Sequence, residues 1–235
     1  MKGIILAGGH GTRLMPLTKV TNKHLLPVGA KPMIYHPIEK LITAGVTEIM
    51  IVTGVDHMGD VVALLGSGRD FGGEFTYRVQ DEAGGIAQAL GLARTFVGDD
   101  PMVVVLGDNV FSDDITPYVN RFRAQEAGAR ILIKEVPDPE RFGVAEIQDG
   151  RVVSIVEKPT LPKSNYCVTG IYMYPSSVFE VVLALEPSGR GELEISDVNA
   201  HYCAQGTLEY DMLAGWWTDA GTHASWKRAN ELAWG

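Results

Sequence analysis

Short runs of apolar, β-branched residues alternate with longer amphipathic stretches over the first 110 residues, and this alternation constrains the fold most strongly. Runs typical of strands occupy residues 2–7, 48–53, 75–80 and 102–106. Helical periodicity occupies residues 32–44, 58–65 and 86–96. An apolar strand bounded on both sides by helices is typical of a parallel sheet buried on both faces. The pattern therefore predicts a doubly wound α/β unit.

The pattern changes after residue 129. Strands are predicted at 130–135, 143–148, 151–157 and 168–174, a helix at 176–185, and further β-structure at 207–213 and 216–218. Asp149 and Gly150 between two of these strands are a strong hairpin signal. We expect this half to extend the sheet and to complete one side of a site, so that residues 1–235 form a single domain.

Charge and composition exclude some classes of partner. The chain has 20 basic and 29 acidic residues, a net charge of −9, which argues against a nucleic-acid or anionic-membrane binder. Residues 4–7 are too few for a signal peptide, and no run approaches the ~20 apolar residues of a membrane span. The chain has only two cysteines, Cys167 and Cys203, and their spacing fits no metal motif. We expect both to be buried, reduced thiols of a cytoplasmic protein.

Glycine is over-represented, with 27 residues in 235, and three glycines follow the first predicted strand. Gly8, Gly9 and Gly11 could direct backbone N–H groups toward phosphate oxygens. The dinucleotide fingerprint fits only in part, because Leu14 stands at its third glycine, and no Walker A lysine follows. A tight turn between strand and helix is the alternative; Arg13 and Lys23 favour a polyphosphate site.

The glycine-rich loop belongs to a series of motifs that runs through nearly the whole chain. They are GGHGTRLMPLT (8–18), KHLLPV (23–28), QDEAGGIAQA (80–89), LGDN (106–109), DPERFG (138–143), EKP (157–159), YCVTGIY (166–172), RGELEISD (190–197) and WTDAGT (217–222). In this order they resemble the sugar-1-phosphate nucleotidylyltransferases, and most closely their glucose-1-phosphate thymidylyltransferase branch.

The resemblance implies an α/β fold, a Rossmann-like three-layer sandwich with a mixed, mainly parallel central sheet. It implies a nucleotide-binding half at 1–110 and a sugar-binding half at 111–235. The reaction would transfer a thymidylyl group from dTTP to α-D-glucose 1-phosphate, giving dTDP-glucose and pyrophosphate, by in-line attack assisted by Mg²⁺. The implied partners are these two small molecules, with no nucleic acid and no membrane; a homo-oligomer is compatible with the resemblance.

The resemblance also assigns site residues. The catalytic residues would be Arg13, Lys23, Asp108 and Lys158. The nucleotide would contact Leu6, Ala7, Gly8, Gly9, Gly11, Thr12, Arg13, Lys23, Gln80, Gly85 and Asp108. The sugar phosphate would contact Asn109, Gly143, Glu157, Lys158, Val168, Thr169 and Gly170. His10 receives no role, and Trp216 and Trp217 are expected to pack beside Asp219.

Two aspartates are the predicted metal ligands. Asp108 follows an apolar strand, at the end where open α/β sheets place ligand groups, and Asp219 follows two tryptophans. Two carboxylates together with substrate phosphates suit Mg²⁺, and no His-rich or Cys-rich cluster indicates zinc. Capping a helix is the alternative role for each aspartate.

Three other readings stay open. The same reaction could use UTP or another sugar 1-phosphate. A protein with this fold could also be a non-catalytic nucleotide-sugar regulator. Finally, the glycine loop could serve a dinucleotide oxidoreductase, although the missing third glycine counts against this. Members of the resembled branch carry a C-terminal helical extension, whereas this chain ends soon after Asp219. We therefore expect a short form, and the sequence leaves open any assembly or allosteric control built on that extension.

Overall fold

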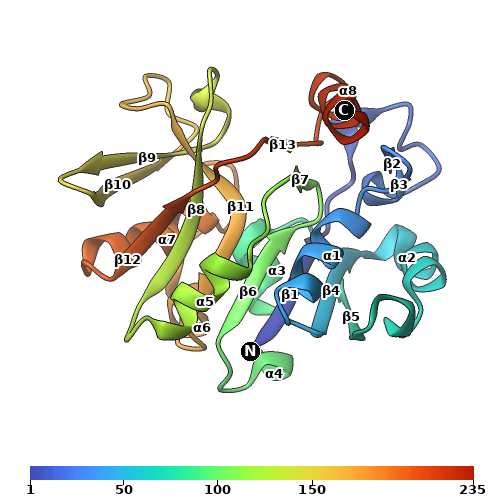
Figure 1. Cartoon of the computed structure of the whole chain (residues 1–235), viewed down its shortest axis with the longest axis horizontal. Coiled ribbons are helices and arrows are strands. Elements are labelled where there is room, and N and C mark those ends of the chain that lie inside the picture. The colour runs from blue at the N-terminus through green and yellow to red at the C-terminus, as the bar shows by residue number, and fades with distance from the viewer.

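A nine-stranded mixed β-sheet forms the centre of the structure, a computed structural model that describes all 235 residues (Figure 1). Along its main path the strands are β10 (Arg151–Glu157), β9 (Gly143–Gln148), β11 (Tyr166–Tyr174), β6 (Met102–Leu106), β1 (Lys2–Ala7), β4 (Glu48–Gly54) and β5 (Glu74–Gln80). Off this path, β8 (Ala129–Glu135) pairs with β11, and β12 (Leu208–Met212) pairs with β8.

Strand direction differs between the two halves of the sheet. The strands β5, β4, β1 and β6 are parallel. The strand β11 then runs antiparallel to β6, to β8 and to β9, while β12 is parallel to β8. The predicted mixed sheet is confirmed, and its parallel part lies mainly in the first 106 residues.

Helices cover both faces of the sheet, which confirms the predicted three layers. One face carries α3 (Ile86–Gly91), α6 (Val178–Ala184) and α7 (Ile195–Ala204), and the other carries α1 (Tyr35–Thr43), α2 (Met58–Leu65) and α5 (Thr116–Ala124). Alternate residues of β1 enter the two resulting cores. Ile4 and Leu6 pack in the core under α3, α6 and α7, whereas Ile5 and Ala7 pack in the core under α1, α2 and α5. This double burial explains why the strand is apolar throughout.

The helices differ from the predictions in several places. The helix predicted from residue 32 begins at Tyr35, because Lys31 and Pro32 form β3 (Lys31–Pro32), which pairs with β2 (Pro27–Val28). The helix predicted over 86–96 is interrupted after Gly91 and resumes as α4 (Arg94–Val97). The helices α5, α7 and α8 (His223–Trp234) were not predicted.

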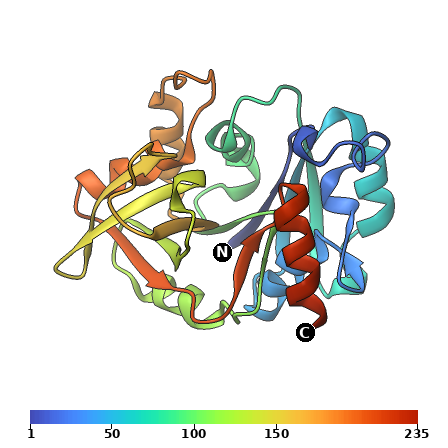
Figure 2. The same ribbon diagram turned by 90° about the horizontal axis from the view of Figure 1, so that it is seen from above.

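The last segment of the chain returns to the first half. The strand β13 (Trp217–Asp219) pairs with β7 (Asn109–Phe111), which follows β6. Figures 1 and 2 show α8 beside the N-terminal half, where Trp226 Nε1 donates to Pro27 O (2.9 Å) and Asn230 Oδ1 accepts from Gly29 N (3.0 Å). A third, smaller core lies beneath α8 and includes Leu14. None of the helices has both the length and the apolar character that a membrane crossing requires.

Candidate active site

A cleft of about 720 Å³ opens between the two halves of the sheet. The strands β6 and β9 pair with the same edge of β11. The strand β9 pairs with it at Cys167, and β6 pairs with it from Ile171 onward, so β6 and β9 diverge around Gly170. Most of the predicted site residues line this cleft: Leu6, Gly8, Gly9, Arg13, Lys23, Gln80, Gly85, Asp108, Asn109, Gly143, Glu157, Lys158, Val168, Gly170 and Asp219.

Four predicted residues do not line the cleft. Ala7 is fully buried in the core, and Thr169 lies on the opposite face of β11, where its hydroxyl donates to Leu132 O (2.7 Å). The predicted ligand contacts of Ala7 and Thr169 therefore cannot involve their side chains. Gly11 and Thr12 lie at the start of the turn that carries Arg13, outside the cleft wall.

The glycine-rich loop is anchored by the residue that breaks the dinucleotide fingerprint. Arg13 and Leu14 belong to a single 3₁₀ turn, Thr12–Leu14, that follows Gly11. Leu14 is fully buried in the third core, beneath α8, while Arg13 stays exposed at the cleft. A glycine in place of Leu14 would leave this turn without its apolar anchor, so the loop is built differently from a dinucleotide-binding loop.

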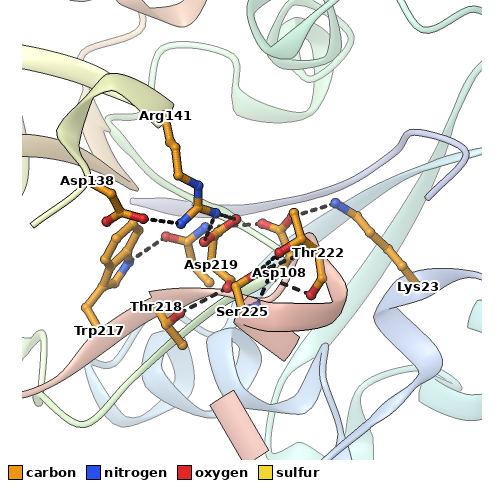
Figure 3. Close-up of polar contacts among 10 residues, drawn as sticks. Lys23, Asp108, Asp138, Arg141, Trp217, Thr218, Asp219, Thr222 and Ser225 are labelled. Atoms are coloured by element: carbon orange, nitrogen blue, oxygen red, sulfur yellow. Dashed lines mark hydrogen bonds and ion pairs between the residues drawn. The ribbon is translucent and has the colours of Figure 1, made fainter. Parts of the chain in front are cut away.

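Asp108 lies just beyond β6 and forms an ion pair with Lys23, at 2.5 Å between Oδ2 and Nζ (Figure 3). Both side chains are 13% exposed. Burial by itself would raise the pKa of Asp108, but the Lys23 charge and hydrogen bonds from Lys23 and Asn109 outweigh it, so this pKa lies below its ordinary value. Asp108 is therefore ionised at neutral pH.

Asp219 on β13 is the second carboxylate of the cleft, and Arg141, which precedes β9, approaches it (Figure 3). The Arg141 guanidinium lies 3.2 Å from Asp219 Oδ1 and also binds Asp138 at 2.7 Å. Burial, followed by repulsion from Asp108, raises the pKa of Asp219, while Arg141 and Arg13 oppose this rise. Two carboxylates with opposite pKa shifts thus face the same cleft.

The two carboxylates converge at Gly221. A Cβ atom on Gly221 would lie 3.2 Å from an Arg13 guanidinium nitrogen, 3.3 Å from Asp219 Oδ2 and 3.5 Å from Asp108 Oδ2. Converging carboxylate oxygens fit a hard divalent cation that takes its other ligands from water and substrate phosphates. No group of three or more His, Cys, Asp or Glu side chains surrounds a common point, so the protein itself offers these two carboxylates and no complete cage.

Asn109 holds the cleft elements together. Its Oδ1 accepts from Gly170 N (2.9 Å) and from Trp217 Nε1 (2.7 Å), and its Nδ2 donates to Asp108 Oδ1 (3.2 Å). The residue is 2% exposed and also lines the cleft, so it supports the cleft elements, and its contact with a sugar phosphate stays a prediction. Trp217 packs edge-on against Phe142, at 5.4 Å between ring centroids, as predicted for a packing residue.

Gln80 stands at the other end of the cleft, with its side-chain amide fixed on one side. Its Nε2 donates to Gln88 Oε1 (2.6 Å) and to Gly85 O (3.4 Å). These two bonds leave Oε1 as the acceptor that faces Gly8, where a Cβ atom would lie 2.2 Å from it. The amide therefore presents an oriented acceptor to any donor bound against the glycine loop.

A charged cluster lines the second half of the cleft. Lys158, at positive φ (42°), lies 3.2 Å from Glu157 Oε1. Glu157 Oε2 accepts from Ser196 Oγ (3.0 Å), and Arg190 lies 3.5 Å from Oε1. Arg190 in turn binds both oxygens of the buried Glu194 at 2.8 Å. Cations thus face the cleft from both halves of the chain.

Sequence reasoning missed several residues of this site. Arg141, Arg190 and Glu194 line the cleft, although none was assigned a role. Each lies inside a motif that carried the resemblance, so the signal was present. His24, which also lines the cleft, follows the recognised Lys23 directly.

Residues 2–233 match the nucleotidyl transferase family. A Neisseria meningitidis serogroup A protein named glucose-1-phosphate thymidylyltransferase is 46% identical over 229 residues, covering 96% of this chain and 80% of its own length. A protein of the same name from Xanthomonas campestris pv. campestris is 47% identical over 228 residues, covering 95% of this chain and 77% of its own.

Solved structures agree with these relatives. A Bacillus anthracis protein provisionally described as a glucose-1-phosphate thymidylyltransferase, solved with sucrose, is 64% identical with a TM-score of 0.96 and covers 100% of this chain and 95% of its own. A UDP-glucose pyrophosphorylase with bound UDP-glucose shares the fold, with a TM-score of 0.86 at 23% identity, covering 98% of this chain and 97% of its own. The chain belongs to the nucleotidyl transferase family.

Proposed function

We propose that the protein is a glucose-1-phosphate thymidylyltransferase, which transfers the thymidylyl group of dTTP to α-D-glucose 1-phosphate. The observation that carries this proposal is the arrangement of charge in one cleft: Arg13 and Lys23 face it from the first half, Lys158 and Arg190 from the second. Two phosphorylated substrates repel each other, and cations on both sides of the cleft would offset that repulsion. Relatives that carry this name support the choice of substrates.

We assign residues 1–110 to the nucleotide and most of residues 111–235 to the sugar phosphate. Gln80 Oε1 would accept the imide N–H of thymine, and Arg13 with the loop amides would hold the departing pyrophosphate. Lys158 and Glu157 would hold the phosphate and hydroxyls of the sugar, next to Gly143 and Val168. Lys23 would contact the phosphates at the reacting centre.

The transfer needs no covalent enzyme intermediate. A non-bridging oxygen of the sugar phosphate attacks the α-phosphorus of dTTP, and the bond to the bridging oxygen of the β-phosphate breaks. The electron pair leaves with pyrophosphate. Asp108 and Asp219 would hold Mg²⁺, which when bound supplies neutralisation of the phosphate charges. Two unpaired cysteines agree with a reducing, cytoplasmic setting.

A substrate panel tests the proposal. The protein is incubated with each of several nucleoside triphosphates and sugar 1-phosphates in Mg²⁺, and both pyrophosphate and product mass are recorded. We expect the highest kcat/KM with dTTP and glucose 1-phosphate, and loss of activity in EDTA. A preference for UTP or another sugar phosphate would keep the reaction and change the substrates. Binding of both substrates without turnover would indicate a regulator instead.

The same assay tests the metal ligands. Asp108→Asn should lower kcat by about 100-fold or more, because it removes a carboxylate at the reacting centre. Asp114→Asn is the matched control, since Asp114 lies on the surface before α5 and bonds Thr116. Full activity in Asp108→Asn would overturn the metal assignment.

A further inference from the structure

Lys23 lies between two buried polar residues, Asn22 and His24, that bond to each other. Asn22 is 6% exposed and His24 is 1% exposed. The side-chain oxygen of Asn22 accepts from the backbone N–H of His24 (2.9 Å) and contacts its Nδ1 (2.6 Å). Because the amide oxygen can only accept, Nδ1 carries the proton. Asn22 thereby caps the single 3₁₀ turn, Lys23–Leu25, from which the Lys23 side chain projects.

The other side of Asn22 is attached to two strand ends. Its Nδ2 donates to Ala7 O (3.5 Å), the last residue of β1, and to Thr53 Oγ1 (3.4 Å), near the end of β4. Thr53 is fully buried, so these bonds are shielded from water. The turn that carries Lys23 is therefore fixed to the sheet rather than held only by its own chain neighbours.

The His24 ring contacts the third strand end. A Cβ atom on Gly107, the residue between β6 and Asp108, would lie 2.7 Å from His24 Cδ2 and 3.1 Å from Nε2. The imidazole thus fills the space beside Gly107, next to the backbone that carries Asp108. Burial, and then the Lys23 charge, lowers the pKa of His24 to about 3, so the ring is a neutral spacer at neutral pH.

We infer that Asn22 and His24 are positioning residues that fix Lys23 relative to Asp108 at the reacting centre. Lys23 has a long, flexible side chain, and its Nζ meets Asp108 Oδ2 at 2.5 Å. Asn22 sets the backbone from which Lys23 starts, and His24 sets the distance from that backbone to the end of β6. This inference rests on the proposed function, in which Lys23 contacts the reacting phosphates. Misplacing such a group by about 1 Å can lower the rate by ~100-fold.

Three variants of His24 test the inference. His24→Leu fills the space without the Nδ1–H donor, His24→Asn keeps a donor near the Nδ1 position, and His24→Gln keeps a polar group near Nε2 instead. We expect His24→Leu to lower kcat by 10- to 100-fold with a small change in the KM for dTTP. His24→Asn should recover most of the loss and His24→Gln should not. His201→Leu, on the exposed surface of α7, is the control and should leave kcat unchanged.

A second readout does not depend on turnover. The rate at which an N-hydroxysuccinimide acetate labels Lys23, followed by peptide mass spectrometry, reports how firmly its amine is held. Labelling should be several-fold faster in His24→Leu than in the wild-type protein or in His24→Asn. In the double variant Asn22→Ala/His24→Leu, kcat should be no lower than in the slower single variant, since each single variant already breaks the Asn22–His24 bond that couples the two residues.

Other results would overturn the inference. It fails if His24→Leu changes neither kcat nor Lys23 labelling, if the two single effects multiply, or if His24→Gln rescues and His24→Asn does not. That last result would indicate direct contact between Nε2 and substrate. The wild-type protein could make no product while Lys23 is still labelled faster in His24→Leu than in the wild-type protein or in His24→Asn. That result would overturn the proposed function and support the positioning of Lys23 by His24.

Discussion

Asp108 and Asp219 face the same cleft but differ in what surrounds them. Lys23 and Asn109 favour the ionised form of Asp108, whereas burial and the charge of Asp108 disfavour the ionised form of Asp219. The site therefore contains one carboxylate that is ionised throughout the neutral range and one that resists ionisation. A bound cation would remove that resistance.

The raised pKa of Asp219 predicts a pH-dependent effect on stability. Well below the ordinary pKa of 3.8 its carboxyl is protonated in both the folded and the unfolded state, and as pH rises through the folded pKa the charge makes folding less favourable. Asp219→Asn removes this penalty. As pH rises from the ordinary pKa of 3.8 through the folded pKa of Asp219, the variant should gain stability relative to the wild-type protein in metal-free urea titrations. A constant difference across this range would contradict the electrostatic account.

Gly8 predicts an effect on nucleotide choice. A Cβ atom there would lie 2.2 Å from Gln80 Oε1, so Gly8→Ala should displace the Gln80 side chain, which can move, rather than unfold the protein. We expect the KM for dTTP to rise by about 10-fold and the preference for dTTP over purine triphosphates to fall. Gly54→Ala is the matched control, because nothing lies within 4 Å of its added Cβ and its φ is −71°. Unchanged nucleotide preference in Gly8→Ala would remove Gln80 from base recognition.

At the scale of elements, α8 supports the loops that carry Arg13 and Lys23. Ala229 is buried in the third core with Leu14 and Leu26, and Trp226 packs against this core. The helix begins with a reciprocal capping box between Thr222 and Ser225, three residues after Asp219. One helix thus joins Asp219, the proposed metal ligand, to the glycine-rich loop.

Replacing Trp226 tests this support. Trp226→Ala should lower the free energy of unfolding by about 2 kcal/mol, since a partly buried ring and its bond to Pro27 are lost. Trp226→Phe should cost about 1 kcal/mol, because it keeps the ring contact and loses the bond. Trp234→Ala, at a residue that is 70% exposed, should stay within ~0.5 kcal/mol of the wild-type protein. Equal stability of Trp226→Ala and Trp234→Ala in urea titrations would contradict the support.

The sequence allowed the central strands to be predicted closely, because β1, β4 and β6 are buried on both faces and are therefore apolar throughout. The helix α5 was missed because only Val119 and Phe122 are buried in its nine residues. In α8 the buried residues are Ser225 and Ala229, which give no apolar periodicity. The candidate site residues were assigned through motifs. Their contacts, such as that between Arg141 and Asp219, join segments 78 positions apart and depend on the tertiary fold.

At the scale of the molecule, residues 1–110 and residues 111–235 share one sheet, and each half lines a different side of the cleft. The proposed assignment of the nucleotide to residues 1–110 and of the sugar phosphate to most of residues 111–235 predicts separate patterns of hydrogen exchange. dTTP should slow exchange at residues 8–14 and 80–86, glucose 1-phosphate at 143–148 and 157–170, and dTDP-glucose at both sets. Protection of the same segments by both substrates would contradict the division at residue 110.

Direct transfer within this cleft is the central claim, and the formation of dTDP-glucose tests it most directly. With dTTP, glucose 1-phosphate and Mg²⁺, the wild-type protein should release dTDP-glucose and pyrophosphate in equal amounts, and should release neither when one substrate is omitted. Stoichiometric binding of both substrates without any dTDP-glucose, or pyrophosphate release from dTTP alone, would contradict it.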